Sequence, residues 1–208
     1  MSFYRERILP HLIQMSMNQA HFEPYRRRVT GAARGRVLEI GVGSGLNLPF
    51  YGKSVRHVIG LEPSPKLLSM ARRKGNAICQ SIDFLEASAE AIPLENKSID
   101  TVVTTWTLCS IPDVIGALNE MRRVLRPEGR FLFVEHGLSP DPSVRRWQDR
   151  LTPLWKRIGG GCHLNRPIAQ LIEETGFRLE RVATGYMKGP RPMTFMYEGA
   201  ARVIVGRR

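Results

Sequence analysis

Short apolar runs alternate with helical patterns through the middle of this chain of 208 residues. Five β-rich runs predict strands at 36–40, 56–61, 83–87, 100–105 and 130–135. Between them, residues 64–74 and 114–125 carry apolar side chains at helical spacing. This alternation is typical of βαβ units on a parallel sheet. We therefore expect an α/β fold, built as a Rossmann-like doubly wound sheet.

Both ends of the chain depart from this pattern. Residues 3–29 mix apolar and basic side chains, and Pro10 and Pro24 predict two short helices, which we place in an N-terminal helical cap at 1–30. The main domain then spans 31–208. Near its end, a helix at 167–175 and strands near 177–183 and 194–205 predict an antiparallel hairpin, so that the sheet is mostly parallel with an antiparallel C-terminal edge strand.

The glycine-rich segment after the first predicted strand carries the strongest functional signal. Gly41, Gly43 and Gly45 follow that strand in G-x-G-x-G spacing, and glycine allows a tight turn and a close approach of a ligand to the backbone. We expect the segment to open a helix. Glu39 directly precedes it, and a carboxylate there suits a cationic ligand better than a pyrophosphate. Glu62 ends the next strand, about twenty residues on, where an acidic side chain can accept hydrogen bonds from ribose hydroxyls.

Four ordered motifs give the chain a family resemblance over 37–136. The motifs are Leu38-Glu39-Ile40-Gly41-Val42-Gly43-Ser44-Gly45, Glu62-Pro63-Ser64, Ala87-Ser88-Ala89-Glu90-Ala91-Ile92-Pro93 and Arg122-Arg123-Val124-Leu125-Arg126-Pro127-Glu128-Gly129. Together they resemble the class I methyltransferases, and within them the ubiquinone/menaquinone-type and type 11 enzymes. The resemblance implies S-adenosyl-L-methionine as the methyl donor, a cofactor with an ammonium group, a sulfonium and no phosphate.

The same resemblance implies which residues hold the donor. The three glycines would wrap its methionine end, Glu62 its ribose, and Ser88 and Ala89 its adenine, although the family often has Asp at the position of Ser88. The full expected donor site is Glu39, Gly41, Gly43, Gly45, Asn47, Glu62, Pro63, Ser64, Ser88, Ala89, Glu90, Thr105 and Trp106.

A narrower resemblance concerns the methyl acceptor. Residues 107–111, Val134-Glu135-His136 and 155–166 are similar to the thiol methyltransferase-like branch, whose animal members carry an N-terminal membrane anchor that we do not expect here. We therefore place a thiol on a small hydrophobic or lipid-like molecule first among acceptors. Carbon methylation of a quinone and nitrogen methylation of a phospholipid stay open as alternatives.

Two histidines are candidate bases for such an acceptor, because a thiol or phenol loses a proton before methylation. His136 follows a strand end and His163 follows the glycine triplet 159–161, and each has the alternative of bonding a loop backbone. Residues 137–166 form a candidate acceptor-side cap. Its helix-like stretch carries an apolar stripe, which we interpret as core in preference to a pocket lining: Trp147, Leu151, Leu154 and Trp155.

The cysteines predict neither a disulfide framework nor a metal site. Cys79, Cys109 and Cys162 are scattered without C-x-x-C spacing, which favours free thiols packed as small hydrophobic side chains. No signal peptide or membrane span is evident, so the expected compartment is the cytoplasm.

The charge balance widens the range of partners. Thirty-one Lys and Arg against 19 Asp and Glu give a formal net charge of +12, which favours anionic partners. Peripheral contact with an anionic membrane surface is therefore an expectation. A nucleic-acid-binding methyltransferase is disfavoured, since Thr104-Thr105-Trp106-Thr107 replaces the D-P-P-Y type of motif. An NAD(P)-dependent reductase is disfavoured by the glycine spacing and by the lack of a Tyr-x-x-x-Lys pair.

Overall fold

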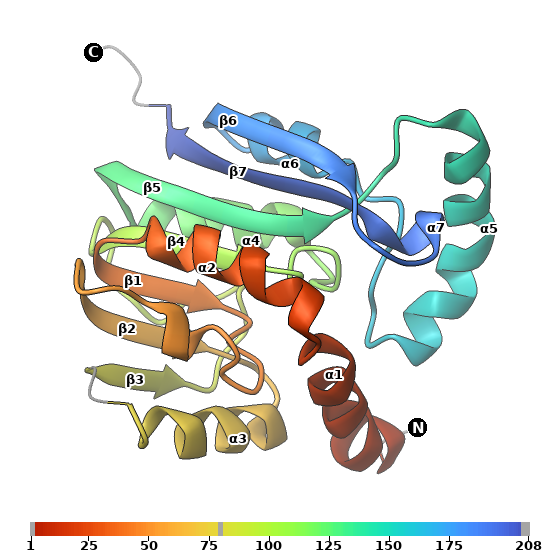
Figure 1. The fold of residues 1–208 in the computed structure, drawn as a ribbon. Helices are drawn as coiled ribbons and strands as arrows, with labels where there is room; N and C mark the ends of the chain where they lie inside the picture. The colour runs from red at the N-terminus through yellow and green to blue at the C-terminus, as the bar shows by residue number, and fades with distance from the viewer. Residues whose placement is uncertain (1–2, 79–80, 205–208) are drawn as a thin grey trace.

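The computed structural model describes residues 3–78 and 81–204, and the chain forms a seven-stranded sheet in the order β3-β2-β1-β4-β5-β7-β6 (Figure 1). The strands are β1 (Gly35–Ile40), β2 (Val55–Leu61), β3 (Ile82–Leu85), β4 (Ile99–Thr105), β5 (Leu125–His136), β6 (Phe177–Tyr186) and β7 (Phe195–Val203). Strands β1 to β5 pair in parallel, and β7 runs antiparallel to both β5 and β6. This confirms the predicted Rossmann-like sheet with an antiparallel hairpin at one side. Within the hairpin β7 lies inside and β6 forms the edge, while residue 205 of the predicted last strand lies outside the described residues.

Helices flank both faces of this sheet. They are α1 (Leu9–Met17), α2 (Glu23–Gly31), α3 (Pro65–Gly75), α4 (Val114–Val124), α5 (Pro142–Ile158), α6 (Ile168–Glu174) and α7 (Arg191–Thr194), with short turns η1 (Tyr4–Ile8), η2 (Ala20–Phe22) and η3 (Leu48–Phe50). Ser64 caps α3 by accepting a hydrogen bond from the amide of Leu67 at 3.4 Å. Asp113 caps α4 in the same way through the amide of Gly116 at 2.9 Å. Both helices therefore begin where a side chain satisfies an amide that the helix leaves unpaired.

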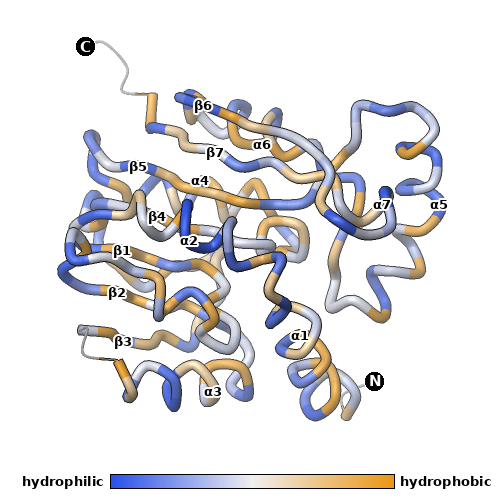
Figure 2. Tube along the Cα trace, viewed as in Figure 1, coloured by the Kyte–Doolittle hydropathy of each residue, from blue (hydrophilic) through white to orange (hydrophobic). Residues whose placement is uncertain are grey.

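Each face of the sheet has its own hydrophobic core. On one face, Val29 of α2 and Leu68 of α3 pack against alternate side chains of the central strands. On the other, Leu118 of α4 and Ile172 of α6 pack against the remaining ones. Figure 2 shows the central strands largely in the hydrophobic colour, while the outer helices alternate between the two colours. Two packed faces explain why the strands read as continuous apolar runs.

The two N-terminal prolines lie near helix starts. Pro24 lies in the first turn of α2, where a missing amide hydrogen removes no helical bond. Pro10 is the second residue of α1, which follows the π-helical segment η1 without a break. Helix α2 crosses the front of the sheet, whereas α1 extends away from it (Figure 1). Helix α2 therefore packs on one face of the sheet, with Val29 in the core.

Helix α5 stands beyond the carboxyl ends of the strands (Figure 1). The fully buried side chain of Gln148 holds it there, donating to the carbonyls of Gly137 at 2.9 Å and Pro192 at 3.1 Å. The interpretation of the α5 stripe as core is wrong for Trp147 and Leu154, which are 55% and 59% exposed. The reason is that only one side of this helix faces the protein.

Among the helices of the described ranges, none is long and apolar enough to cross a membrane.

Candidate active site

The glycine-rich loop after β1 keeps one face open. Gly41, Gly43 and Gly45 all have a positive φ, at 67°, 56° and 77°. A Cβ on Gly41 would lie 2.5 Å from the side chain of Thr107, so this glycine lets the loop pack against the segment after β4. A Cβ on Gly43 would meet only the carbonyl of Gly41, at 3.8 Å. Gly43 therefore faces space that a ligand can enter close to the backbone.

The loop does not open a helix, contrary to the prediction. It leads into the single 3-10 turn η3, in which Leu48 is buried in the core. Packing of Leu48 and the following proline hold the chain in this short turn. A helix N-terminus is the usual binding site for a pyrophosphate, so its absence from this part of the described chain disfavours a dinucleotide.

Glu39 lies buried beneath the loop and organises it. Its carboxylate accepts hydrogen bonds from Asn47 Nδ2 and from the hydroxyl of Tyr51, both at 2.8 Å. Asn47 also donates to Thr105 Oγ1 at 2.9 Å and accepts from Arg26 at 2.7 Å. Burial raises the pKa of Glu39 to about 7, against the lowering effect of these hydrogen bonds and of Arg26.

The sequence pointed to Glu39, Asn47 and Thr105 but missed Arg26 and Tyr51. Burial lowers the pKa of Arg26 to about 10 although Glu39 acts in the opposite direction. No local motif marks either residue, because α2 and the turn after η3 bring them to the loop from outside the signature.

Glu62 links the end of β2 to the same loop. Its two carboxylate oxygens accept hydrogen bonds from the amides of Gly43 at 3.1 Å and Ser64 at 2.9 Å. Burial raises its pKa even though both amides favour the charged form. Pro63 beside it is exposed, and Ser64 caps α3. A carboxylate oxygen accepts more than one hydrogen bond, so Glu62 retains sites for further donors.

The predicted adenine-side residues form a separate network after β3. Ser88 donates to Glu90 at 3.1 Å, and the other oxygen of Glu90 accepts from the amide of Asp113 at 2.7 Å. Ala89 between them is 5% exposed. The network ties this segment to the start of α4.

Trp106, directly after β4, has an unusual backbone. Its φ is +53°, a conformation that a large side chain rarely adopts and that occurs often at ligand sites. Phe22 packs edge-on against its ring at 4.8 Å, and the guanidinium of Arg26 lies 4.9 Å from the ring centre. Its buried indole N–H has no partner in the described structure.

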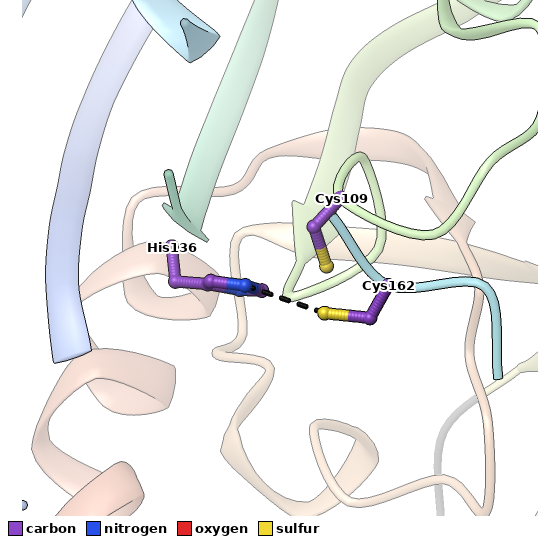
Figure 3. A group of neighbouring side chains, drawn as sticks. All are labelled: Cys109, His136 and Cys162. Atoms are coloured by element: carbon purple, nitrogen blue, oxygen red, sulfur yellow. Dashed lines mark hydrogen bonds between the residues drawn. The ribbon is translucent and has the colours of Figure 1, made fainter. Parts of the chain in front are cut away.

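A second cluster lies at the carboxyl ends of β4 and β5. Cys109, His136 and Cys162 point toward one another, and the Sγ of Cys162 lies 3.3 Å from the Nε2 of His136 (Figure 3). All three are buried. Cys109 and Cys162 are free thiols, as predicted, and Cys79 lies outside the described residues. The sequence predicted His136 as a site residue but did not indicate that two thiols lie beside it.

His163, the other predicted base, lies half-buried at the rim of this cluster. Its amide donates to the carbonyl of Cys109 at 2.8 Å, and its ring Nδ1 lies 3.2 Å from the same oxygen. Since a carbonyl can only accept, this contact places the hydrogen on Nδ1 and leaves a lone pair on Nε2. Burial and then the charge of Arg166 lower the pKa of His163, which favours the neutral form of its ring.

The pKa values of several groups in and around the cluster are shifted. A hydrogen bond with Cys162 lowers the pKa of Cys109, while burial opposes it. Burial acts to lower the pKa of His136, but the adjacent Cys109 outweighs it and raises that pKa. Burial raises the pKa of Glu135 to about 8, and one of its carboxylate oxygens has no partner among the described residues. Such perturbed groups are typical of functional sites.

Comparison with known proteins identifies the family of the chain. Residues 38–133 match the family of methyltransferase domains. Human thiol S-methyltransferase TMT1B is 39% identical over 156 residues, which are 72% of this chain and 63% of that protein. The ubiquinone/menaquinone C-methyltransferase UbiE of Bartonella tribocorum is 27% identical over 167 residues, 78% of this chain and 61% of that protein. The chain thus spans about three fifths of the length of these curated relatives.

Solved structures with a similar fold include methyltransferases as well. A SAM-dependent methyltransferase from Thermotoga maritima superposes with a TM-score of 0.70 at 19% identity, covering 98% of this chain and 99% of that one. The methyltransferase-domain match, the curated relatives and the fold all agree, and the donor of this class is S-adenosyl-L-methionine. The chain belongs to the class I S-adenosylmethionine-dependent methyltransferases.

Proposed function

We propose that the protein transfers a methyl group from S-adenosylmethionine to the thiol of a small hydrophobic molecule. The observation that carries this proposal is the position of the His163 ring, whose Nδ1 lies 3.2 Å from the carbonyl of Cys109 and whose Nε2 keeps a lone pair for a proton. Cys109 belongs to the segment that follows the expected donor residues Thr105 and Trp106. The 39% identity to a protein named thiol S-methyltransferase supports the same acceptor class.

In this proposal the open face at Gly43 receives the methionine end of the donor, and Glu62 accepts hydrogen bonds from the ribose. The Nε2 of His163 takes the proton of the acceptor thiol. The thiolate then attacks the methyl carbon in line, the carbon–sulfonium bond breaks toward the donor sulfur, and the products are a methyl thioether and S-adenosylhomocysteine. Alignment of the two sulfur atoms supplies most of the acceleration.

A donor-consumption assay across acceptor classes tests the proposal. The panel contains alkyl thiols, a demethylquinone, phosphatidylethanolamine and RNA, with the methylated product identified by mass spectrometry. We expect turnover with alkyl thiols and one equivalent of S-adenosylhomocysteine per thioether. Preferential methylation of quinone carbon, of phospholipid nitrogen or of RNA would refute the assignment.

The role of His163 has its own control. In His163→Gln we expect kcat/KM for an alkyl thiol to fall by about 100-fold or more, the usual contribution of a positioned base. An acidic aromatic thiol is already ionised near pH 7 and needs no base, so its kcat/KM should change much less. Equal losses with both thiols would exclude His163 as the base.

We also propose that α5 contacts anionic membrane surfaces, from which a hydrophobic acceptor can be drawn. Three exposed apolar side chains, Trp147, Leu154 and Ile158, share this helix with exposed arginines such as Arg146 and Arg150. Such a helix lies in a membrane interface with its basic groups near lipid phosphates. Co-sedimentation with phosphatidylglycerol vesicles, lost in Trp147→Ser and absent with phosphatidylcholine, is the expected result. Equal binding of the variant would contradict this role.

A further inference from the structure

Three segments bring metal-binding side chains to one point. Cys109 follows β4, His136 is the last residue of β5, and Cys162 follows the glycine triplet after α5 (Figure 3). Their two Sγ atoms and one imidazole nitrogen all lie within 4.8 Å of one another. Within 3–78 and 81–204, no other group of three or more His, Cys, Asp or Glu is arranged in this way.

The backbone holds this arrangement in place. Gly160 and Gly161 have φ of +67° and +91°, which turns the chain so that Cys162 faces the interior. A Cβ on Gly161 would lie 3.3 Å from the carbonyl of Ser110, so the two ligand-bearing segments are closely packed. The hydrogen bond from the amide of His163 to the carbonyl of Cys109 joins them directly. The donor atoms are therefore positioned before any ligand arrives.

The chemistry of the cluster selects the ligand. Thiolate and imidazole are soft donors that prefer zinc over magnesium or calcium. Leu164 and the partly buried Trp155 and Met193 surround the thiols with apolar surface, so water competes weakly for a bound cation. Two Cys and one His are also a known ligand set of catalytic zinc sites, which keep the fourth position open.

We propose that Cys109, His136 and Cys162 bind one Zn²⁺ ion whose open fourth position receives the acceptor thiol. Two thiolates neutralise the charge of the ion. Nearby, the guanidinium of Arg166, which is 8% exposed, interacts with both thiols and can balance the added negative charge of a third thiolate. The absence of C-x-x-C spacing had argued against a metal, but the ligands come together only through the fold.

The part played by the acceptor rests on the proposed function. When the thiol binds, its sulfur forms a bond to zinc and its S–H bond breaks, with the proton passing to the Nε2 of His163. The zinc-bound sulfur then attacks the methyl carbon of S-adenosylmethionine, and the electron pair of the carbon–sulfonium bond returns to the donor sulfur. The thioether formed is a neutral, weak ligand and leaves the metal. Zinc in this role keeps the acceptor ionised and in place.

Metal binding is measured on the full chain without donor or acceptor. After dialysis against a chelator and then addition of Zn²⁺, we expect one Zn²⁺ per chain by mass spectrometry. Co²⁺ added instead should give thiolate-to-cobalt charge-transfer absorption with tetrahedral d–d bands. In Cys162→Ser the affinity for Zn²⁺ should fall by more than about 100-fold, with circular dichroism reporting retention of the fold. His57→Gln is the matched control, because His57 contacts Ser81 and Asp83 away from the cluster.

A wild-type protein without the charge-transfer band, or a Cys162→Ser variant that keeps both the band and the affinity, overturns the metal site. Addition of a small alkyl thiol to the cobalt form should change the d–d bands, and unchanged bands overturn the open fourth position. The two proposals fail separately. Thiol methylation that persists in the metal-free protein refutes the role of zinc in the reaction but not the proposed function. Metal binding without thiol turnover refutes the proposed function but not the metal site.

Discussion

Replacement of Glu39 by Gln should make the free energy of unfolding depend less on pH. Glu39 is fully buried, and its pKa of about 7 lies above the ordinary value of 4.5. Between about pH 4.5 and 7 the folded protein therefore holds a proton on Glu39 that the unfolded chain has released. The stability that Glu39 contributes in this way is fully present below pH 4.5 and is lost as the pH rises through 7. At about 1.4 kcal/mol per pKa unit, the loss attributable to Glu39 is roughly 3 kcal/mol by pH 8.

Urea unfolding from pH 5 to pH 8.5 measures this effect. In wild-type protein the free energy of unfolding should fall across the range, and in Glu39→Gln the fall should be smaller by roughly 3 kcal/mol. Glu135 has a raised pKa of about 8 and acts in the same direction, so part of the slope will remain. Glu95→Gln, at an exposed position, is the control and should follow the wild type. A wild-type slope in Glu39→Gln would refute the reasoning.

Three further changes test the donor site and its support. Glu62→Ala should weaken binding of S-adenosylmethionine by about 1–3 kcal/mol in calorimetry, because the ribose hydroxyls lose their acceptor; Glu95→Ala should bind normally, and equal affinities would remove Glu62 from the site. Gly43→Val should abolish donor binding because its side chain fills the open face of the loop, and donor binding at wild-type affinity would place the ligand elsewhere. Tyr51→Phe deprives the buried carboxylate of Glu39 of a hydrogen bond and should lower the free energy of unfolding by about 1.5–3 kcal/mol; an unchanged urea midpoint would show that this bond contributes nothing.

The sequence predicted the parts of the fold that local pattern controls. Strands buried on both faces read as apolar runs, and the caps at Ser64 and Asp113 mark helices that begin there. The turn after the glycine loop was not predictable in this way. Leu48 sits in the core through contacts with distant residues, and that packing replaces the expected helix with one 3-10 turn.

The residues of the expected donor site share a local motif, whereas other residues that contact the glycine loop or the cysteine cluster do not. Gly43 and Glu62 belong to a short motif whose spacing survives in the linear sequence, and the structure joins them by a hydrogen bond. Arg26, which reaches the side chain of Asn47, comes from a helix that precedes the motif. Cys162 reaches His136 only after an intervening helix has folded. Contacts of this kind depend on tertiary packing, which no periodicity records.

The inside position of β7 in the sheet sets an order of assembly. Strands β5 and β6 do not pair with each other, because β7 lies between them and pairs with both. In the β5–β7 pairing, Met196 lies opposite His136. While the chain is being synthesised, the parallel strands and the glycine loop can therefore form before residue 195 has been added. The side of β5 that later pairs with β7 stays an unpaired sheet edge until then. A nascent chain would thus form the glycine loop first and complete the sheet around β5 last.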